Sequence, residues 1–184
     1  MEIAGLTDSA FVHTVIRKRP QDVHKGDCGR VLIVAGSKGM AGAAVFTAKS
    51  AIKCGSGLVK VCTRKKNFPI LQISVPESIC IRWGRTKKDL EQYDAIAVGP
   101  GMGAGRRTRK ILKRILKEYQ KTVVIDADGL NAVAGSRKLQ KLVRETGARV
   151  IITPHIGEAK RLLGNSRLMG LTKLQIAASL RHYY

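Results

Sequence analysis

Acidic residues are scarce in this chain, and several common functional signals are absent. Its 184 residues include 13 Asp and Glu against 34 Lys and Arg, giving a formal net charge of +21. Aromatic residues make up only 4% of the chain, and no RNA-binding aromatic motif, zinc finger or recognition-helix pair accompanies the basic residues. No uncharged apolar stretch approaches the ~20 residues that a membrane-spanning helix requires. These absences argue against a dedicated nucleic-acid-binding module and against an integral membrane protein.

The cysteines and the amino terminus point to a cytoplasmic protein. Cys28, Cys54, Cys62 and Cys80 form no C-x-x-C pair and lie near no cluster of histidines, which disfavours a zinc site. Residues 1–20 carry acids early and lack the long apolar core of a signal peptide. We therefore expect four reduced thiols. The chain also lacks the G-x-S-x-G elbow of α/β hydrolases and the paired carboxylates of glycosidases.

The excess of positive charge has two interpretations. The segment RRTRKILKRILKEYQK, residues 106–121, carries apolar residues at helical spacing: Ile111, Leu112, Ile115, Leu116 and Tyr119. Its basic residues would then cover the solvent side of an amphipathic helix. We favour this solvated face, and a surface that binds polyanions remains the alternative.

Apolar runs alternate with helical patterns along the chain. Strands are expected at residues 30–35, 58–62, 76–83, 95–98, 122–125 and 149–152. Helices are expected at 41–54, 106–119, 136–146, 157–163 and 172–183, with a turn or helix at 87–93. Residues 67–76 suggest an irregular segment, and 164–170 a loop. This alternation predicts an α/β fold: one three-layer α/β/α domain, residues 1–184, with a mostly parallel sheet.

Four glycine-rich or polar motifs follow four of the expected strands. They are GSKGMAGA (residues 36–43), GPGMG (99–103), DADGLN (126–131) and TPHIGE (153–158). In an open parallel sheet, ligands bind beyond the carboxyl ends of the strands. The four motifs therefore predict one binding site assembled from distant parts of the chain.

The two glycine-rich motifs favour close approach of a ligand to the backbone. Gly36, Gly39 and Gly42 lie between a strand and a helix, whose free N–H groups can bind an anion. Their spacing matches neither the G-x-G-x-x-G fingerprint nor a P-loop, so a plain tight turn remains possible. GPGMG can lie under a phosphate or a flat ring, or be a glycine-rich loop without a ligand.

The DADGLN motif places two acids after a strand. A carboxylate directly after an apolar strand, such as Asp126, is expected to need a partner, a metal ion or a ligand. Asp128 can cap a helix that begins at about residue 130. Neighbouring acids of this kind can also hold Mg²⁺ through water beside a phosphate.

The TPHIGE motif lies at the entry to a helix. Thr153 is a candidate cap for that helix, and His155 can donate to a phosphate or sugar. Glu158 can hold a water on Mg²⁺. A purely structural role for the histidine is the alternative.

The order and spacing of these motifs resemble the NAD(P)H-hydrate dehydratases of the ribokinase-like superfamily. The matching stretches are HKGDCGRVLIVAGSKGMAGAAVFTAKSAIKCGSGLVKV, PES, GPGMG, VVIDADGLN and ITPHIGEAKRLLG. The resemblance implies a ribokinase-like fold and repair of hydrated NADH or NADPH with ADP or ATP and Mg²⁺. Phosphorylation of the hydrate hydroxyl and loss of phosphate would restore the cofactor. It also implies a homo-oligomer, a tetramer by that resemblance. From the composition and the missing motifs we expect neither a membrane nor nucleic acid as a partner.

The resemblance also assigns roles to residues of the four motifs. Ala43, Gly103 and His155 would contact the hydrated dinucleotide, and Asp126 and Asn131 would line the same cleft. Gly99 and Gly101 would belong to the cofactor-binding loop. Glu158 would occupy the place of the acidic residue in the superfamily's metal-associated motif, acting through water.

One part of the family pattern does not occur in this sequence. The family continues with a G-x-G-D turn that supplies an anion hole, much of the nucleotide site and the catalytic Asp, and no G-x-G-D is present here. We expect the carboxy-terminal part of the fold to be missing, the catalytic residue to be unassigned, and the isolated chain to turn over little. An inactive dinucleotide-binding or regulatory module, a polyanion-binding basic protein and another kinase of the superfamily remain as alternatives.

Overall fold

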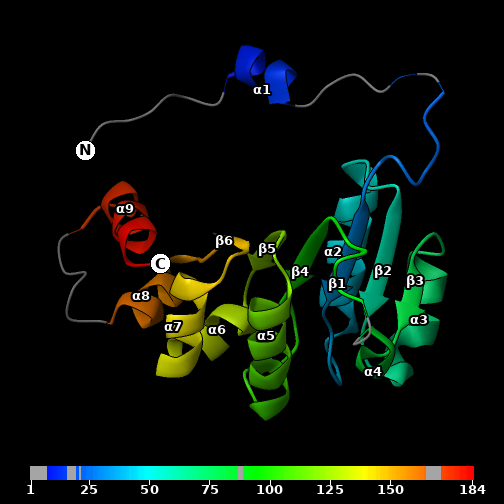
Figure 1. Cartoon of the computed structure of the whole chain (residues 1–184). Helices are drawn as coiled ribbons and strands as arrows, with labels where there is room; N and C mark the ends of the chain where they lie inside the picture. The colour runs from blue at the N-terminus through cyan, green and yellow to red at the C-terminus, as the bar shows by residue number, and fades with distance from the viewer. Residues whose placement is uncertain (1–7, 16–19, 21, 87–88, 165–170) are drawn as a thin grey trace.

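Six parallel strands form one sheet in the described part of the chain, confirming the expected α/β class. The computed structural model describes residues 8–15, 20, 22–86, 89–164 and 171–184. The strands are β1 (Arg30–Val34), β2 (Leu58–Cys62), β3 (Ile79–Ile81), β4 (Ala95–Val98), β5 (Thr122–Ile125) and β6 (Arg149–Ile152). Their order is β3-β2-β1-β4-β5-β6, and every neighbouring pair is parallel (Figure 1).

Helices connect the strands and cover the sheet. They are α1 (Ser9–Val15), α2 (Ala41–Lys53), the 3₁₀ turn η1 (Lys65–Asn67), α3 (Phe68–Ser74), α4 (Trp83–Thr86), α5 (Arg106–Glu118), α6 (Asp128–Ala134), α7 (Arg137–Glu145), α8 (Ile156–Leu163) and α9 (Lys173–Tyr183). Helix α1 lies apart from the sheet (Figure 1). None of the helices in the described ranges is long and apolar enough to cross a bilayer. Residues 1–7, 16–19 and 21, the first two residues of the turn or helix expected at 87–93, and most of the loop expected at 164–170 lie outside the described residues.

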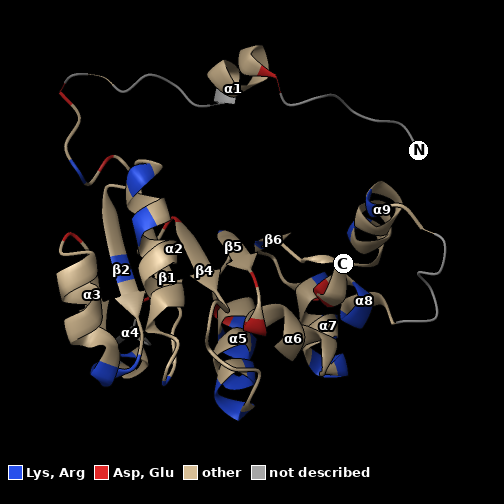
Figure 2. Ribbon diagram, turned by 180° about the vertical axis from the view of Figure 1, so that it is seen from behind, with Lys and Arg blue, Asp and Glu red and all other residues tan. Residues whose placement is uncertain are grey.

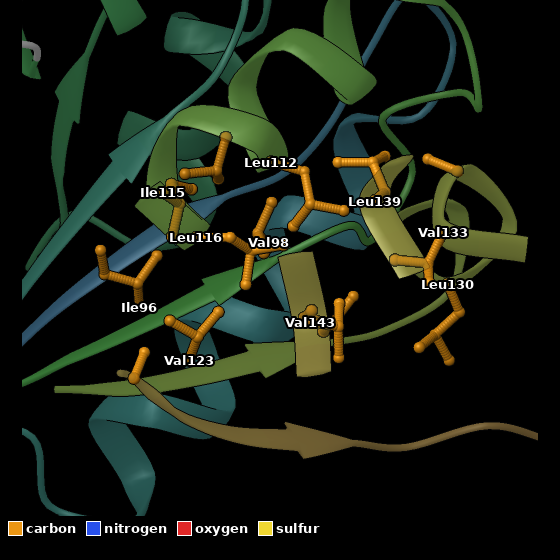
Figure 3. Close-up of a cluster of buried hydrophobic side chains, with 14 of the residues drawn as sticks. Ile96, Val98, Leu112, Ile115, Leu116, Val123, Leu130, Val133, Leu139 and Val143 are labelled. Atoms are coloured by element: carbon orange, nitrogen blue, oxygen red, sulfur yellow. The ribbon is translucent and has the colours of Figure 1, made fainter. Parts of the chain in front are cut away.

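Two apolar cores lie on opposite faces of the sheet, because side chains alternate along each strand. In β1, Leu32 and Val34 belong to one core and Ile33 to the other. The first core packs β4 and β5 against α5, α6 and α7 (Figure 3), and the second packs β1 and β2 against α2 and α3. This is the three-layer arrangement predicted from the alternation of strands and helices.

The strand order places a topological switch point between β1 and β4. From β1 the chain proceeds to β2 and β3 in one direction, then returns to β4 on the other side of β1. In doubly wound sheets the crevice at such a point is the usual ligand site. The segments that follow β1 and β4 are the GSKGMAGA and GPGMG motifs, so both border this crevice.

The prediction of an irregular segment at residues 67–76 was wrong, because this segment forms α3. Pro69 lies in the first turn of this helix, where a missing N–H costs nothing. Leu71 and Val75 are 0% and 2% exposed and pack in the second core. Burial of these side chains therefore decides the conformation of a segment whose local sequence is ambiguous.

Candidate functional site

The GSKGMAGA and GPGMG loops contact each other directly. The Gly36 N–H donates to the Pro100 carbonyl oxygen at 2.8 Å. Gly101 has φ +62°, and a Cβ at this position would lie 2.8 Å from the Ala43 Cβ. The backbone of the second loop therefore lies against the start of α2, which brings Gly101 and Ala43 together as predicted candidates.

The GPGMG and DADGLN loops pack still more closely. A Cβ on Gly99, which has φ +131°, would lie 1.8 Å from the Asp126 carbonyl oxygen and 2.8 Å from the Gly129 amide nitrogen. The Gly103 N–H donates to the Asp128 Oδ2 at 2.7 Å. Asp128 therefore stabilises the neighbouring loop, a contact that the sequence analysis did not identify.

The DADGLN turn differs from the expectation in two ways. Helix α6 begins at Asp128, so this residue is its first helical position rather than its cap, and the cap is Ala127. Ala127 has φ 48° and ψ −117°, which is unfavourable for a residue with a side chain. Asp126 is half-buried, and its Oδ1 accepts from the Ala127 N–H at 2.7 Å, so a backbone amide provides the partner that its carboxylate needs.

The TPHIGE turn is organised by a pair of side chains at the start of α8. His155 is the cap, rather than Thr153 as predicted, and its Nδ1 accepts from the Gly157 N–H at 3.0 Å. The buried Glu158 accepts from the His155 N–H at 3.0 Å through Oε2, and its Oε1 lies 3.4 Å from the His155 Nε2. Both carboxylate oxygens thus face His155 in a capping box.

A third set of contacts joins the DADGLN and TPHIGE segments. The Thr153 N–H donates to the Ile125 carbonyl oxygen at 3.3 Å. The Arg161 Nε donates to the Asn131 Oδ1 at 2.8 Å, so the Asn131 amide already has a protein partner. The four motifs therefore form one continuous band along the carboxyl ends of β1, β4, β5 and β6.

Two cavities lie beside this band. The larger, about 850 Å³, is lined by apolar residues of β6, α8 and α9 and by His155. The smaller, about 260 Å³, lies at the switch point and is lined by Gly36, Gly103 and three arginines: Arg64, Arg106 and Arg107.

Four of the predicted site residues line neither cavity: Ala43, Asp126, Asn131 and Glu158. From sequence, the basic residues were interpreted as a solvated face, with a polyanion-binding surface as the alternative. The sequence does contain a pattern that could have indicated the smaller cavity, because the glycine-rich loop is followed directly by Arg106 and Arg107.

The comparisons with known proteins agree with this arrangement of motifs. The profile of the Carb_kinase family, described as NAD(P)H-hydrate dehydratase, matches residues 31–184. The chain belongs to this family. It is 37% identical over 153 residues to the ADP-dependent (S)-NAD(P)H-hydrate dehydratase of Listeria monocytogenes, covering 80% of this chain and 53% of that protein. The corresponding enzyme of Staphylococcus aureus is 34% identical, with 81% of this chain and 54% of that protein covered.

Solved structures share the fold. An ADP/ATP-dependent NAD(P)H-hydrate dehydratase from Bacillus subtilis, co-crystallised with ATP and Mg²⁺, matches with a TM-score of 0.72 and 30% identity over 84% of this chain and 54% of its own. A ribokinase-like superfamily protein from Enterococcus faecalis matches with a TM-score of 0.72 and 28% identity, covering 90% and 59%. The chain thus spans about half the length of these dehydratases and has the ribokinase-like fold.

The residues present fit a nucleotide and Mg²⁺ only in part. No group of three or more His, Cys, Asp or Glu side chains able to hold a metal ion occurs in the ranges that the structure describes. Asp128 and Glu158 are both engaged by protein groups. By contrast, Gly103 lines the smaller cavity and has nothing within 4 Å of an added Cβ, so its backbone is open to a dinucleotide or nucleotide. The Cβ positions of Gly99 and Gly101 face protein atoms instead.

Proposed function

We propose that this chain forms the hydrated-dinucleotide side of an NAD(P)H-hydrate dehydratase site that works with ADP or ATP and Mg²⁺. One observation carries the proposal: along the carboxyl edge of the sheet, each of the four motif segments that identify the family contacts the next one. A platform built from distant loops and anchored on rigid strands suits the positioning of a large, flexible substrate.

The nucleotide, when bound, would convert the hydroxyl of the hydrate into a phosphate ester, which is a better leaving group than hydroxide. The residues of this chain would bind and orient the substrate. Gly103 would let the dinucleotide lie against the backbone, and the Asp128 carboxylate would keep the Gly103 amide in place. Gly101, packed against Ala43, would fix the position of the same loop. In this assignment Asp126 and Asn131 border the same platform.

His155 is placed to contact the substrate with the exposed part of its ring, because both ring nitrogens face protein groups. Its Nδ1 accepts from a backbone N–H, so the neutral ring carries its proton on Nε2. Its side chain is 67% exposed, whereas the Glu158 side chain beside Nε2 is 7% exposed. Glu158 therefore orients the imidazole, and a further role in holding a water on Mg²⁺ is part of this proposal.

The test is to measure binding and turnover separately on the isolated chain. We expect titration calorimetry to show binding of NADH hydrate or NADPH hydrate. We also expect little recovery of reduced-nicotinamide absorbance when ADP or ATP and Mg²⁺ are added, because no G-x-G-D turn is present. Rapid nucleotide-dependent recovery would contradict the prediction of low turnover, and absence of hydrate binding would contradict the proposed function.

An inactive dinucleotide-binding or regulatory module is the second candidate, favoured by the engagement of both Asp128 and Glu158 with protein groups. A module would bind the normal cofactor as tightly as its hydrate, whereas a repair site would prefer the hydrate. Titration with NADPH beside NADPH hydrate separates the two. A cytoplasmic location and assembly into a homotetramer belong to the proposal of a repair enzyme.

A further inference from the structure

The cavity at the switch point has a composition that differs from the rest of the candidate site. Its volume is about 260 Å³, and it is bounded by the loop after β1, the end of β2 and the start of α5. Sites for whole drug-sized ligands are larger, about 300–1,000 Å³. This space is therefore suited to one group of a larger ligand.

Three arginines, and no acidic residue, line this cavity. Arg64 follows β2, whereas Arg106 and Arg107 begin α5, so the arginines come from two separate segments of the lining. None of the three has a carboxylate partner within the described ranges of the chain. Figure 2 shows the concentration of Lys and Arg at the lower end of α5, where that helix begins.

Asp128, which contacts a lining residue of the cavity, is engaged by that residue. Asp128 Oδ2 accepts from the Gly103 N–H, which belongs to the cavity lining. This hydrogen bond fixes the loop after β4 and directs one carboxylate oxygen to the backbone. The arginines on the other walls are left to attract an anionic ligand.

Two buried polar side chains, Asn67 and Thr63, hold the backbone around the cavity in place. Asn67 is 5% exposed and donates from Nδ2 to the Ser37 carbonyl oxygen at 3.3 Å and to the Thr63 Oγ1 at 3.0 Å. Thr63 donates in turn to the Gly36 carbonyl oxygen at 3.3 Å. The loop after β1 is thus tied to the end of β2, so the wall that carries Arg64 is preorganised relative to the first loop.

The first turn of α5 adds to the attraction for an anion. Gly105 is the cap of this 13-residue helix and provides no side-chain hydrogen bond to it. The Thr108 hydroxyl donates to the Gly103 carbonyl oxygen, away from the first N–H groups of the helix. Free N–H groups and the helix dipole therefore act in the same direction as the arginines.

We propose that this cavity is a phosphate-binding subsite in which Arg64, Arg106 and Arg107 hold a phosphate group of the substrate. The proposal rests on the proposed function for the identity of the ligand, a hydrated dinucleotide. Guanidinium groups bind phosphate oxygens with paired hydrogen bonds, which fits three arginines around a small space. The phosphate is either the ribose 2′-phosphate of NADPH hydrate or the pyrophosphate bridge common to both hydrates.

The experiment compares two double variants on the same helix. Arg106→Ala/Arg107→Ala removes two lining side chains, whereas Arg109→Ala/Lys110→Ala removes the same charge from exposed residues of α5 outside the cavity. Alanine is favourable in a helix, so both proteins are expected to fold. Binding of inorganic pyrophosphate, NADPH hydrate and NADH hydrate is measured by calorimetry at fixed ionic strength.

We expect the lining variant to weaken pyrophosphate and NADPH hydrate by about 10-fold or more, as for loss of charged hydrogen bonds. The control is expected to stay within about twofold, because Arg109 and Lys110 do not line the cavity and act on its ligand only through screened, longer-range attraction. Arg64→Ala should weaken the same ligands. If only NADPH hydrate is weakened among the hydrates, the subsite holds the 2′-phosphate; if both hydrates are weakened equally, it holds the pyrophosphate bridge.

Two outcomes overturn the subsite. Either pyrophosphate fails to bind the unmodified chain, or the lining and control variants lose the same affinity, which would indicate general attraction by net charge. These outcomes are distinct from failure of the proposed function. If both hydrates bind the lining variant normally, only the subsite is wrong; if pyrophosphate binds and neither hydrate does, the subsite stands and the proposed function is wrong.

Discussion

Substitution of Gly99 by alanine tests the tightest contact between two of the family motifs. The added Cβ would lie 1.8 Å from the Asp126 carbonyl oxygen and 2.8 Å from the Gly129 amide nitrogen. Both neighbours are backbone atoms, so no flexible side chain can move away. The residue also has φ +131°, where a side chain is unfavourable.

Two terms contribute to the expected loss of stability. A φ of +131° lies beyond the left-handed helical region, in a sparsely populated part of backbone space, and costs about 1–3 kcal/mol for a residue with a side chain. Displacing packed neighbours costs typically about 1–3 kcal/mol, and the reduced entropy of the unfolded chain returns about 0.4–1 kcal/mol. The net expectation is a loss of about 3 kcal/mol, a large fraction of the roughly 5–15 kcal/mol that stabilises a typical domain.

Two other glycines of the same segment provide matched controls. Gly103 has φ +74° but nothing within 4 Å of an added Cβ, so Gly103→Ala tests conformation alone and should cost about 1 kcal/mol. Gly105 has φ −81° and equally open surroundings. Gly105→Ala should be nearly neutral, because the poorer helix cap offsets the entropic gain.

Urea unfolding followed by circular dichroism gives the three differences directly. With a slope of about 1–3 kcal/mol per molar urea, the Gly99→Ala midpoint should fall by at least about 1 M. The order of loss should be Gly99→Ala, then Gly103→Ala, then Gly105→Ala. If Gly99→Ala costs no more than Gly103→Ala, the GPGMG and DADGLN loops do not pack as closely as described.

Three further predictions concern local strain, pH and the start of α8. Ala127→Gly should change the free energy of unfolding by less than about 0.5 kcal/mol, because relief of the unfavourable φ offsets the flexibility of glycine. The control Ala51→Gly, within α2, should lower the free energy of unfolding by about 1 kcal/mol in the same urea assay. Burial raises the pKa of Tyr119 to about 12 from 10.0, so the unfolded chain releases this proton at lower pH than the folded chain, and the stability present below pH 10 is lost as the pH rises towards 12. Tyr119→Phe should make this loss of stability with pH shallower in thermal melts across the range. An unchanged slope would exclude the tyrosine as its source. Glu158→Ala should lower stability by about 1–2 kcal/mol through loss of the capping box, with Glu158→Gln retaining an acceptor and most of the stability in thermal melts; equal losses would contradict the capping role.

Most strands and long helices could be predicted from sequence because their apolar patterns are strong. The predicted strand at 95–98 coincides with β4, and the amphipathic segment after residue 105 forms α5 with Ile111, Leu112, Ile115 and Leu116 buried. Segments with weak local signals were less predictable. Residues 67–76 form α3 because Leu71 and Val75 are buried against the sheet, which no local pattern reveals.

The candidate site was predicted in outline and differed in detail. The motifs were expected at one edge of the sheet, and hydrogen bonds do connect them there. The capping roles were assigned to the wrong residues, because cap choice depends on backbone angles: Ala127 takes a positive φ, and His155 rather than Thr153 adopts the cap position. Roles in substrate, cofactor and metal binding remain predictions.

The sequence by itself determined the fold class, the family and the order of the four motifs, because these depend on periodicity and on residue types at fixed spacing. Only the tertiary structure decided which groups meet. It brought the Gly103 amide to Asp128, Asn131 to Arg161, and Arg64 to the same cavity as Arg106 and Arg107. The physical reason is that such pairs are separated by about 25 to 43 positions along the chain and become neighbours only when parallel strands align their carboxyl ends.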